Sequence, residues 1–551
     1  MNAHDATSPG ALAAQAHVVV VGGGIAGMVA ALECAKIGMR VTLVEASTAL
    51  GGTVHTAEIA GHVIDVGAQG FSTRGGVVQE LIDELGLGAE VVVPEAGTPW
   101  VAGLPGGGAA PLPAGGVLGI PGNPFVAEVT RVIGSRGSWR AYLDRVRPVL
   151  TIGREHSLGR LVRSRMGARV LDRLVAPVTR GTYGVAPDDI DVEVAAPGLN
   201  GALTRTGSLS GAVLQLQGDD AGAGGASLRG IRGGMHRLVA ALEARLREFG
   251  VEVRTGTSAI ALRAGAALGS GDPFAPAPRA WQLELLEAVK EADAGADDVG
   301  EPLDGEFAAR EPLDALETHP LPPLGADFVI VATPESDARR LLGLPATGAE
   351  AARETATEKA AAASSAPADA SGVAAEFAVE VVTLVLDAPG LDPAPRGAEV
   401  FPVPGSSRAV ALIDETERWP ELARELAADG RRRHVVRVLF GAADEPPATA
   451  GLDAADATAM AVAEASALLG VPLSAGHVLG SHRARFAQAP PAALIGHEQR
   501  TAGLRRSIAA RPGVVAVGAW LAGSGIAQVI PDAAAQAEIV RQAALWGADT
   551  A

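Results

Sequence analysis

Three glycines near the start of the chain, Gly22, Gly24 and Gly27, have the spacing of a turn that holds a pyrophosphate. They follow an apolar run at residues 17–21, and a second apolar run beyond them ends at Glu45. In the dinucleotide-binding fingerprint the first glycine permits the turn, the second admits the pyrophosphate to the backbone, and the third lets helix and strand pack closely. The terminal acid would accept hydrogen bonds from a ribose diol. The pattern predicts that the chain binds a dinucleotide.

These groups act together only if residues 17–45 fold as strand, tight turn, helix and strand. The helix would then present its free N–H groups and the positive end of its dipole to the pyrophosphate. A second strand entering a glycine is expected at residues 514–518, and residues 523–526 read Gly-Ser-Gly-Ile. Glycine segments at both ends of the chain suit one long, enclosed cofactor better than a nicotinamide that must come and go. FAD is therefore predicted over NAD.

The composition limits the classes of function. A chain of 551 residues is long enough for two or three domains. Its net charge of -18 argues against a nucleic-acid partner. The chain has a single cysteine, Cys34, which excludes internal disulfides and Cys-X-X-Cys chemistry. Because Cys34 lies in the first predicted helix, we expect it to be a buried core residue. We find neither a signal peptide nor an apolar stretch of spanning length. We therefore expect a cytoplasmic protein, with peripheral membrane contact left open.

Further along the chain, the alternation of predicted helices and strands returns, but stretches expected to be loops interrupt it. A Gly-Gly-Met turn at residues 233–235 precedes a predicted helix and a strand at 251–253, and another buried strand is expected at 327–333. The first and last glycine units therefore bracket an inserted domain. Strands of a separate sheet are predicted at residues 379–386 and 435–440. The Gly/Pro/Ala-rich stretch 265–325, apart from a strand at 281–286, and the Ala-rich stretch 346–375 are expected to be loops.

One region departs from the acidic balance. Twelve arginines stand between Arg131 and Arg180, against three acidic residues. Apolar residues at helical spacing over residues 158–174 predict an amphipathic basic helix or helix pair there. Such a segment is either a solvated face that covers a core, or a surface for an anionic substrate, an acidic membrane or an acidic partner protein.

The chain resembles the flavin-dependent protoporphyrinogen and coproporphyrinogen oxidases of the flavin amine oxidase superfamily, from about residue 17 to residue 543. Residues 22–27, 45, 51–52 and 518–526 carry the superfamily part. The more specific segments, which are similar to those of the Gram-positive type, are residues 65–71, 112–121, 174–177, 181–183, 485–486 and 491–497. The sequence departs from the family pattern at Thr53, where relatives carry Arg or Lys beside the FAD phosphates, and at Ala68, Gly70, Phe486 and Ala527.

The resemblance implies an α/β fold: a discontinuous Rossmann-like FAD-binding domain with an inserted mixed-sheet substrate domain and a helical domain. The expected ranges are 17–75, 226–265, 326–336 and 500–545 for the FAD-binding domain, 76–190 for the helical, membrane-facing domain, and 191–225 and 337–499 for the substrate domain. Residues 1–16 are expected to be disordered, and 266–325 and 346–375 to be flexible insertions.

The resemblance also implies the reaction. An FAD-dependent oxidase would convert coproporphyrinogen III to coproporphyrin III in haem biosynthesis, with molecular oxygen as the acceptor. Alternatives left open are protoporphyrinogen IX as the substrate, another reaction of the amine oxidase type, and a non-catalytic protein that binds FAD and porphyrin. The expected partners are the porphyrinogen, oxygen, and either a membrane surface in peripheral contact or an enzyme of the haem pathway in transient contact.

Because the flavin carries the chemistry, we predict neither a catalytic side chain nor a metal site, and His55 and His497 are expected to be structural. Two arginines are predicted to bind substrate propionates, Arg74 and the weaker candidate Arg180. The predicted cofactor contacts are Gly22, Gly23, Gly24, Ile25, Ala26, Gly27, Glu45, Ala46, Gly52, Thr53, Gly67, Ala68, Gln69, Gly70, Ala259, Phe486, Gly525, Ile526 and Ala527.

Overall fold

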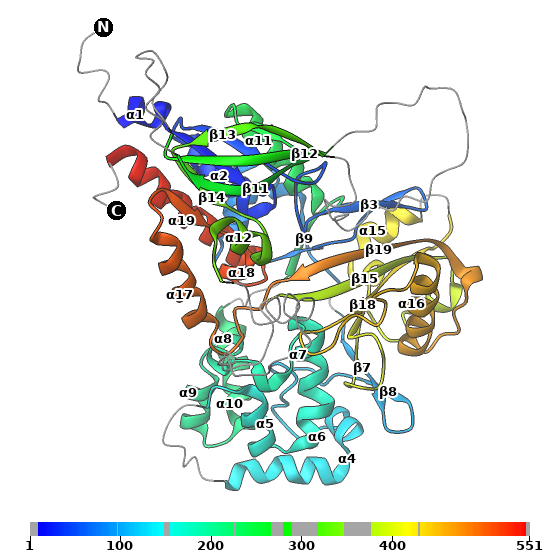
Figure 1. Cartoon of the computed structure of the whole chain (residues 1–551). Coiled ribbons are helices and arrows are strands. Elements are labelled where there is room, and N and C mark those ends of the chain that lie inside the picture. The colour runs from blue at the N-terminus through cyan, green and yellow to red at the C-terminus, as the bar shows by residue number, and fades with distance from the viewer. Residues whose placement is uncertain are drawn as a thin grey trace, which may run out of the picture.

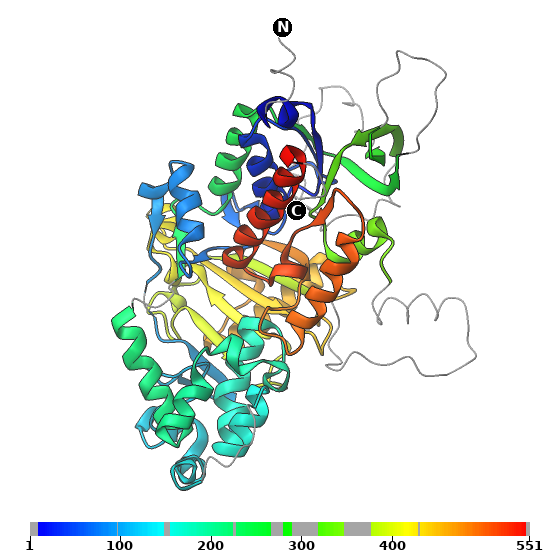
Figure 2. The ribbon, with the colours of Figure 1, turned by 90° about the vertical axis from the view of Figure 1, so that its left-hand side faces the viewer.

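The computed structural model describes residues 9–95, 97–147, 155–223, 228–265, 279–288, 318–345, 376–427 and 430–546. Figure 1 shows three parts: an α/β part that holds both ends of the described chain, a sheet that includes β15, β18 and β19, and a group of helices from α4 to α10 at the far end. In the view turned by 90°, the helical group again lies at the opposite end from the chain termini (Figure 2). Residues 346–375, where we predict a flexible insertion, lie outside the described residues.

The α/β part is built on a five-stranded parallel sheet with the order β10-β2-β1-β14-β20. These strands come from distant parts of the chain, which confirms the predicted discontinuous α/β architecture: β1 (His17–Val21), β2 (Arg40–Val44), β10 (Glu252–Arg254), β14 (Phe328–Val331) and β20 (Val514–Ala516). A parallel sheet buried on both faces needs apolar residues on both sides of each strand, and β1 supplies four valines in a row.

The two faces of this sheet are covered differently. Val18 and Val20 point into a core made with α2 (Ile25–Lys36), α3 (Val77–Glu84), α11 (His236–Glu248) and α19 (Ile526–Trp546). Val19 and Val21 point into a second core, shared with the antiparallel sheet β11-β12-β13 and with α12 (Glu335–Leu342), α17 (His497–Ala509) and α18 (Ala519–Ala522). The strands of that antiparallel sheet are β11 (Thr257–Ala264), β12 (Trp281–Ala288) and β13 (Thr318–Ala326). Cys34 is buried in the first core, as predicted, and burial raises the pKa of its thiol to about 12.

The second part is a seven-stranded sheet with the order β19-β15-β18-β17-β16-β7-β8. Its strands are β7 (Trp100–Leu104), β8 (Gly108–Pro111), β15 (Phe377–Leu386), β16 (Glu399–Pro402), β17 (Ala411–Asp414), β18 (His434–Phe440) and β19 (Val478–Gln488). All pairs are antiparallel except β16 with β7, which makes the sheet mixed, as predicted. Helix α16 (Ala454–Leu469) packs on one face. The hairpin of β3 (Thr56–Ile59) and β4 (His62–Asp65) lies against the other face.

The helical part forms one core, to which the apolar residues of the basic region contribute. Its main elements are α4 (Ala127–Tyr142), η3 (Leu143–Val146), α5 (Leu158–Arg165), α6 (Ala168–Val170), η4 (Leu171–Val175), α7 (Ala176–Tyr183), η5 (Pro187–Asp189), α8 (Val192–Ala195), α9 (Leu199–Thr206) and α10 (Leu209–Ala223). The basic segment, predicted to be one helix or a helix pair, is divided between α5 and α6, where Gly167 has a φ of 92°. Among the helices of the described ranges, none has both the length and the apolar character needed to cross a bilayer.

Several predicted boundaries are wrong. Residues 9–15 form α1 (Pro9–Gln15) instead of a disordered segment, because Ala13 and Ala16 are buried in the first core. Strands β7 and β8, which lie in the range predicted for the helical domain, join the seven-stranded sheet. Residues 191–218, predicted for the substrate domain, contribute to the helical core instead. Strand β13 lies in a stretch expected to be loop; its three prolines hide the strand pattern.

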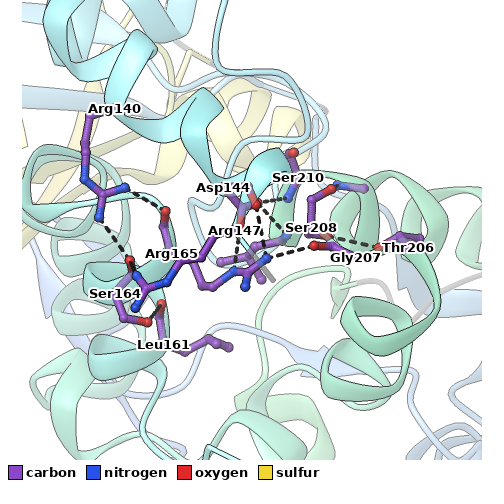
Figure 3. Close-up of polar contacts among 12 residues, drawn as sticks. Arg140, Asp144, Arg147, Leu161, Ser164, Arg165, Thr206, Gly207, Ser208 and Ser210 are labelled. Carbon is purple, nitrogen blue, oxygen red and sulfur yellow. Dashed lines mark hydrogen bonds and ion pairs between the residues drawn. The ribbon is translucent and has the colours of Figure 1, made fainter. Parts of the chain in front are cut away.

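A buried ion pair ties the helical part together (Figure 3). Asp144 is fully buried, and its Oδ1 accepts a hydrogen bond of 2.5 Å from Arg165 Nε. Its Oδ2 accepts hydrogen bonds from the backbone N–H groups of Leu209 and Ser210 at the start of α10. The Arg165 guanidinium also donates to the carbonyl of Gly207, which ends α9. One carboxylate therefore fixes η3, α5 and the α9–α10 turn relative to one another.

We predict that Asp144→Ala destabilises the protein by about 3–5 kcal/mol, because it leaves the Arg165 charge buried and unpaired. The measurement is thermal and urea unfolding of the full chain. The matched control is Asp172→Ala, which removes an exposed carboxylate from the same part and should change the stability by less than about 0.5 kcal/mol. Equal unfolding midpoints for the two variants would contradict this role of Asp144.

Candidate cofactor and substrate site

The turn from β1 into α2 is shaped by glycines that leave no room for side chains. Gly22 has a φ of 110°, and its N–H donates to the carbonyl of Val44 at 2.8 Å. A Cβ on Gly27 would lie 1.9 Å from Gly22 O, so α2 can pack this closely against the turn only with glycine there. Gly24 caps α2, and no side chain accepts from the first turn of the helix. Ile25 and Ala26 begin that turn, so their N–H groups are available to an anion.

A second glycine pair lies across this helix end. Gly51 N–H donates to Gly23 O at 2.9 Å, and Gly24 and Gly51 form an isolated parallel bridge. A Cβ on Gly24 would meet nothing nearer than Gly52 Cα, at 3.8 Å, whereas a Cβ on Gly52 would come within 3.1 Å of Gly24. Two backbones without side chains therefore flank an open helix N-terminus. That is a surface which a pyrophosphate can approach closely, so the residues present fit the predicted dinucleotide.

Glu45 directly follows β2 and lies beside this turn. Its Oε2 accepts from Gly23 N–H at 2.6 Å, and its Oε1 accepts from the backbone N–H and the hydroxyl of Ser47. A carboxylate has about four lone-pair positions, and three are occupied by these contacts, so one remains for a ribose hydroxyl. A second position becomes available if the Ser47 hydroxyl turns away from Glu45. Ala46 is half-buried next to it. Ala259 is buried on β11, two residues beyond Thr257, whose N–H donates to the Glu45 carbonyl.

The loop after β4 joins the same site. Ala68 N–H donates to Thr53 O at 2.9 Å, and a Cβ on Gly67 would lie 1.9 Å from that oxygen. Thr53 itself is exposed, and Gly70 packs against the carbonyl of Arg229 on β9 (Leu228–Ile231). The structure thus brings together predicted cofactor residues from positions 22–27, 45–53 and 67–70.

The seven-stranded sheet holds this loop through a residue that the sequence analysis missed. Arg437 on β18 is buried, and its Nη2 donates to the carbonyls of Val66 and Gly67, both at 3.0 Å. Its charge is met by buried Glu415, with 3.8 Å between Arg437 Nη1 and Glu415 Oε1. Burial raises the pKa of Glu415, while the charges of Arg418 and Arg437 oppose that shift.

Glu415 is itself held in place by Trp419, whose Nε1 donates to its Oε2 at 3.0 Å. Gln69, a predicted cofactor contact, donates from its Nε2 to the Asp65 carbonyl at 3.5 Å, within the same loop. On the loop's other side, Asp65 Oδ2 accepts from Met235 N–H at 2.7 Å, which ties the loop to the turn that begins α11.

The C-terminal segment reaches the same edge of the parallel sheet. Strand β20 pairs with β14, which pairs with β1, so the Gly518 turn and the Gly22 turn both follow carboxyl ends of strands. Gly525 precedes α19, and the half-buried Ile526 and Ala527 in the first turn of that helix pack against the first core.

Phe486 lies on β19 next to His55, with 6.3 Å between the ring centroids. Burial lowers the pKa of His55, and a hydrogen bond to the Gly52 backbone and the Asp65 charge act in the opposite direction. Burial, followed by the Arg500 charge, lowers the pKa of His497. A structural role for both histidines stays a prediction that agrees with their neutral, enclosed settings.

The two predicted substrate arginines differ in their surroundings. Arg74 follows β5 (Phe71–Ser72) and is exposed. Burial raises the pKa of the Tyr183 phenol at the end of α7, and the charge of Arg74 opposes that shift. Arg180 is held by two ion pairs of 2.7 Å, to Asp444 and Glu445, with 12% of its side chain exposed. Its charge is already compensated, so of the two residues Arg74 is the better placed for an anionic substrate.

The fold and these contacts define a class of protein with a dinucleotide-binding turn. The turn lies against the loop of residues 65–70, called the cofactor loop below, which is supported by the seven-stranded sheet that we predict to bind substrate, called the substrate sheet below. The family described as flavin containing amine oxidoreductase matches residues 25–271, which confirms the sequence resemblance and the prediction of a flavin cofactor. FAD is the flavin whose pyrophosphate and ribose the fingerprint and Glu45 suit.

Two similar curated proteins are coproporphyrinogen III oxidases. The chain is 30% identical to that of Propionibacterium freudenreichii subsp. freudenreichii over 46% of its own length and 53% of the relative. It is 34% identical to that of Bacillus subtilis (strain 168) over 32% of its own length and 37% of the relative. The chain thus spans about half the length, or less, of the curated relatives that it matches.

A crystal structure from Exiguobacterium sp. 255-15, assigned provisionally as a protoporphyrinogen oxidase, has the same fold. The TM-score is 0.70 at 20% identity, and the match covers 96% of this chain and 98% of that one.

We predict that Arg437→Met weakens FAD binding by roughly 10-fold or more, since each hydrogen bond from a charged donor contributes about 1.5–3 kcal/mol. The measurement is the Kd for FAD of the apoprotein, followed by flavin fluorescence. Arg424→Met is the matched control, because Arg424 is 72% exposed and pairs with Glu421 on the surface of α15 (Pro420–Leu426). The same Kd in both variants would show that Arg437 does not position the cofactor loop.

Proposed function

We propose that this protein is an FAD-dependent oxidase that converts coproporphyrinogen III to coproporphyrin III with molecular oxygen, in haem biosynthesis. The observation that carries the proposal is the junction at residues 65–70, where the dinucleotide turn meets a loop anchored by the substrate sheet. The names of the similar curated proteins supply the substrate class.

The residues of the chain have distinct tasks in this proposal. The N-terminus of α2 and the Gly51–Gly52 backbone would bind the pyrophosphate, and Glu45 the ribose. Bound FAD would supply the redox chemistry, accepting hydride from the substrate's methylene bridges and passing electrons to oxygen. The balance for six electrons is three O₂ reduced to three H₂O₂. Arg437 and Glu415 hold the cofactor loop against the substrate sheet, and Arg74 would orient a propionate.

The proposal is tested by following porphyrin fluorescence and oxygen uptake with coproporphyrinogen III and protoporphyrinogen IX side by side. We expect the FAD-loaded protein to oxidise the four-carboxylate substrate faster. Equal or inverted rates would reassign it to protoporphyrinogen IX. An absence of oxygen uptake despite bound FAD would overturn the oxidase proposal and favour a non-catalytic binding protein.

We predict that Arg74→Ala raises the KM for coproporphyrinogen III by about 10–100-fold, the equivalent of one charged hydrogen bond, with FAD content unchanged. The control is Arg263→Ala, which removes a 68% exposed arginine on β11. A KM equal to that of the control would remove Arg74 from the substrate site.

We also propose that the protein contacts membranes peripherally through an α4 patch, defined as Phe125, Trp139, Tyr142, Leu143 and Val146. The three rings of the patch lie 5.0–6.0 Å from one another, while 62% of Trp139 and 73% of Val146 are exposed. Arg145 is exposed in the same segment, and its guanidinium lies 5.6 Å from the centre of the Tyr142 ring. Aromatic residues beside arginines are typical of surfaces that insert between anionic headgroups. Helix α4 lies at the end of the molecule far from the parallel sheet (Figure 1).

The membrane prediction is that the protein co-sediments with phosphatidylserine vesicles, and that the double variant Trp139→Ser/Val146→Ser weakens this binding by roughly 10-fold, as the loss of buried apolar area requires. Leu479→Ser, at an exposed position on β19, is the control. Vesicle binding that is absent, or unaffected by the double variant, would contradict the proposal and favour a protein partner for the basic region.

A further inference from the structure

A cluster of potential metal ligands lies at one end of the seven-stranded sheet, where β17 and β18 are paired. Asp414 ends β17, Glu417 follows on α14 (Glu415–Arg418), and His434 begins β18. Each residue offers one ligand atom, and these three atoms lie within 4.8 Å of one another. His434 Nδ1 and Asp414 Oδ2 are 3.8 Å apart. The antiparallel pairing of the two strands brings together residues that are separated in the sequence.

The histidine is oriented as a ligand would be. Its side chain is fully buried, and Nε2 makes a 3.1 Å hydrogen bond with Asp392 Oδ1. A carboxylate at Nε2 favours the tautomer with the proton on that nitrogen, which leaves a lone pair on Nδ1. Nδ1 is buried and has no hydrogen-bond partner. A carboxylate behind a histidine whose other nitrogen faces further carboxylates is the arrangement found around bound metal ions.

The carboxylates are positioned by the local backbone. Asp414 is buried, and its Oδ1 accepts from the N–H and hydroxyl of Thr416 and from Glu417 N–H, which caps α14. That capping fixes Glu417 on the same side as Asp414. The Glu417 side chain is 18% exposed, so an ion could enter from this side.

The charges of the cluster are left unbalanced. Among the residues that the structure describes, Asp414, Glu417 and Asp392 contribute three carboxylates. Arg432 lies beside two of them, 2.5 Å from Glu417 Oε1 and 3.8 Å from Asp392 Oδ1. A cation at the free side of Asp414 would stabilise this buried carboxylate.

We propose that Asp414, Glu417 and His434 bind a divalent transition-metal ion, with Asp392 orienting the histidine. One imidazole nitrogen and two carboxylate oxygens suit Zn²⁺ with water in the remaining position. The sequence analysis predicted no metal site, because it assigned the chemistry to the flavin and these three residues come from separate elements. The role is structural, because the ion would fix α14, whose first residue is Glu415. Glu415 in turn faces the charge of Arg437, which holds the cofactor loop.

The test uses the full chain, stripped of metals with a chelator and titrated with Zn²⁺ alone by calorimetry. We expect one saturable site per chain and a higher Tm with Zn²⁺ than without it. Glu417→Gln should weaken the binding at least 10-fold and remove the Tm increase. The matched control, Glu421→Gln on the neighbouring α15, should retain both.

Glu417 lies at the edge of the cluster, so its variant should fold even if His434→Ala does not. An absence of saturable Zn²⁺ binding, or equal binding by the Glu417 and Glu421 variants, would overturn the site. In the second case the zinc would be held adventitiously by other side chains.

Discussion

The approach of three backbone segments at the carboxyl edge of the parallel sheet sets the geometry of the whole molecule. Gly27 lets α2 start against the Gly22 carbonyl, and Gly67 lets the loop after β4 lie against the Thr53 carbonyl. At both positions a Cβ would come within 1.9 Å of an oxygen, closer than any packed interior allows. Replacing either glycine would push apart the segments that enclose the open N-terminus of α2. The cofactor surface thus depends on the absence of side chains at a few positions.

Arg437 extends that constraint from the nucleotide part to the substrate sheet. A buried guanidinium is costly unless its hydrogen bonds and charge are met. Here two loop carbonyls accept from Arg437 Nη2 and the charge of Glu415 faces it, while Arg437 Nε has no hydrogen-bond partner among the described residues. The same interaction makes the cofactor loop part of both domains. Any displacement of β18 or α14 therefore moves the loop, which is why the cluster of Asp414, Glu417 and His434 beside them concerns the cofactor as well as the sheet.

Local sequence signals predicted the nucleotide part well. The valine run of β1, the glycine spacing and the apolar periodicity of α11 are each encoded within about 15 residues, so they could be recognised without the rest of the chain. Strand β13 could not be recognised in this way, because prolines dominate its sequence. Its partner β12 is also separated from it by a long connection in the sequence.

The support of the site was beyond sequence reasoning for a different reason. Arg437 lies within an apolar strand pattern, and its partners Val66 and Gly67 are about 370 residues away in sequence. Arg165 and Arg180 were counted as part of a basic surface, yet each is paired with carboxylates that only the tertiary structure brings near. Charge counting therefore overstated the number of free cations in the region.

The central claim is that the flavin bound at the Gly22–Gly27 turn takes electrons directly from a porphyrinogen held at the substrate sheet. Anaerobic mixing of the FAD-loaded protein with coproporphyrinogen III tests it most directly. The account predicts that the absorbance of oxidised flavin is lost on mixing, with two electrons taken up per flavin. Porphyrin fluorescence then appears when oxygen is admitted, because reoxidised flavin can complete the six-electron oxidation in further cycles. Flavin that stays oxidised while bound to the protein in the presence of excess substrate would contradict it.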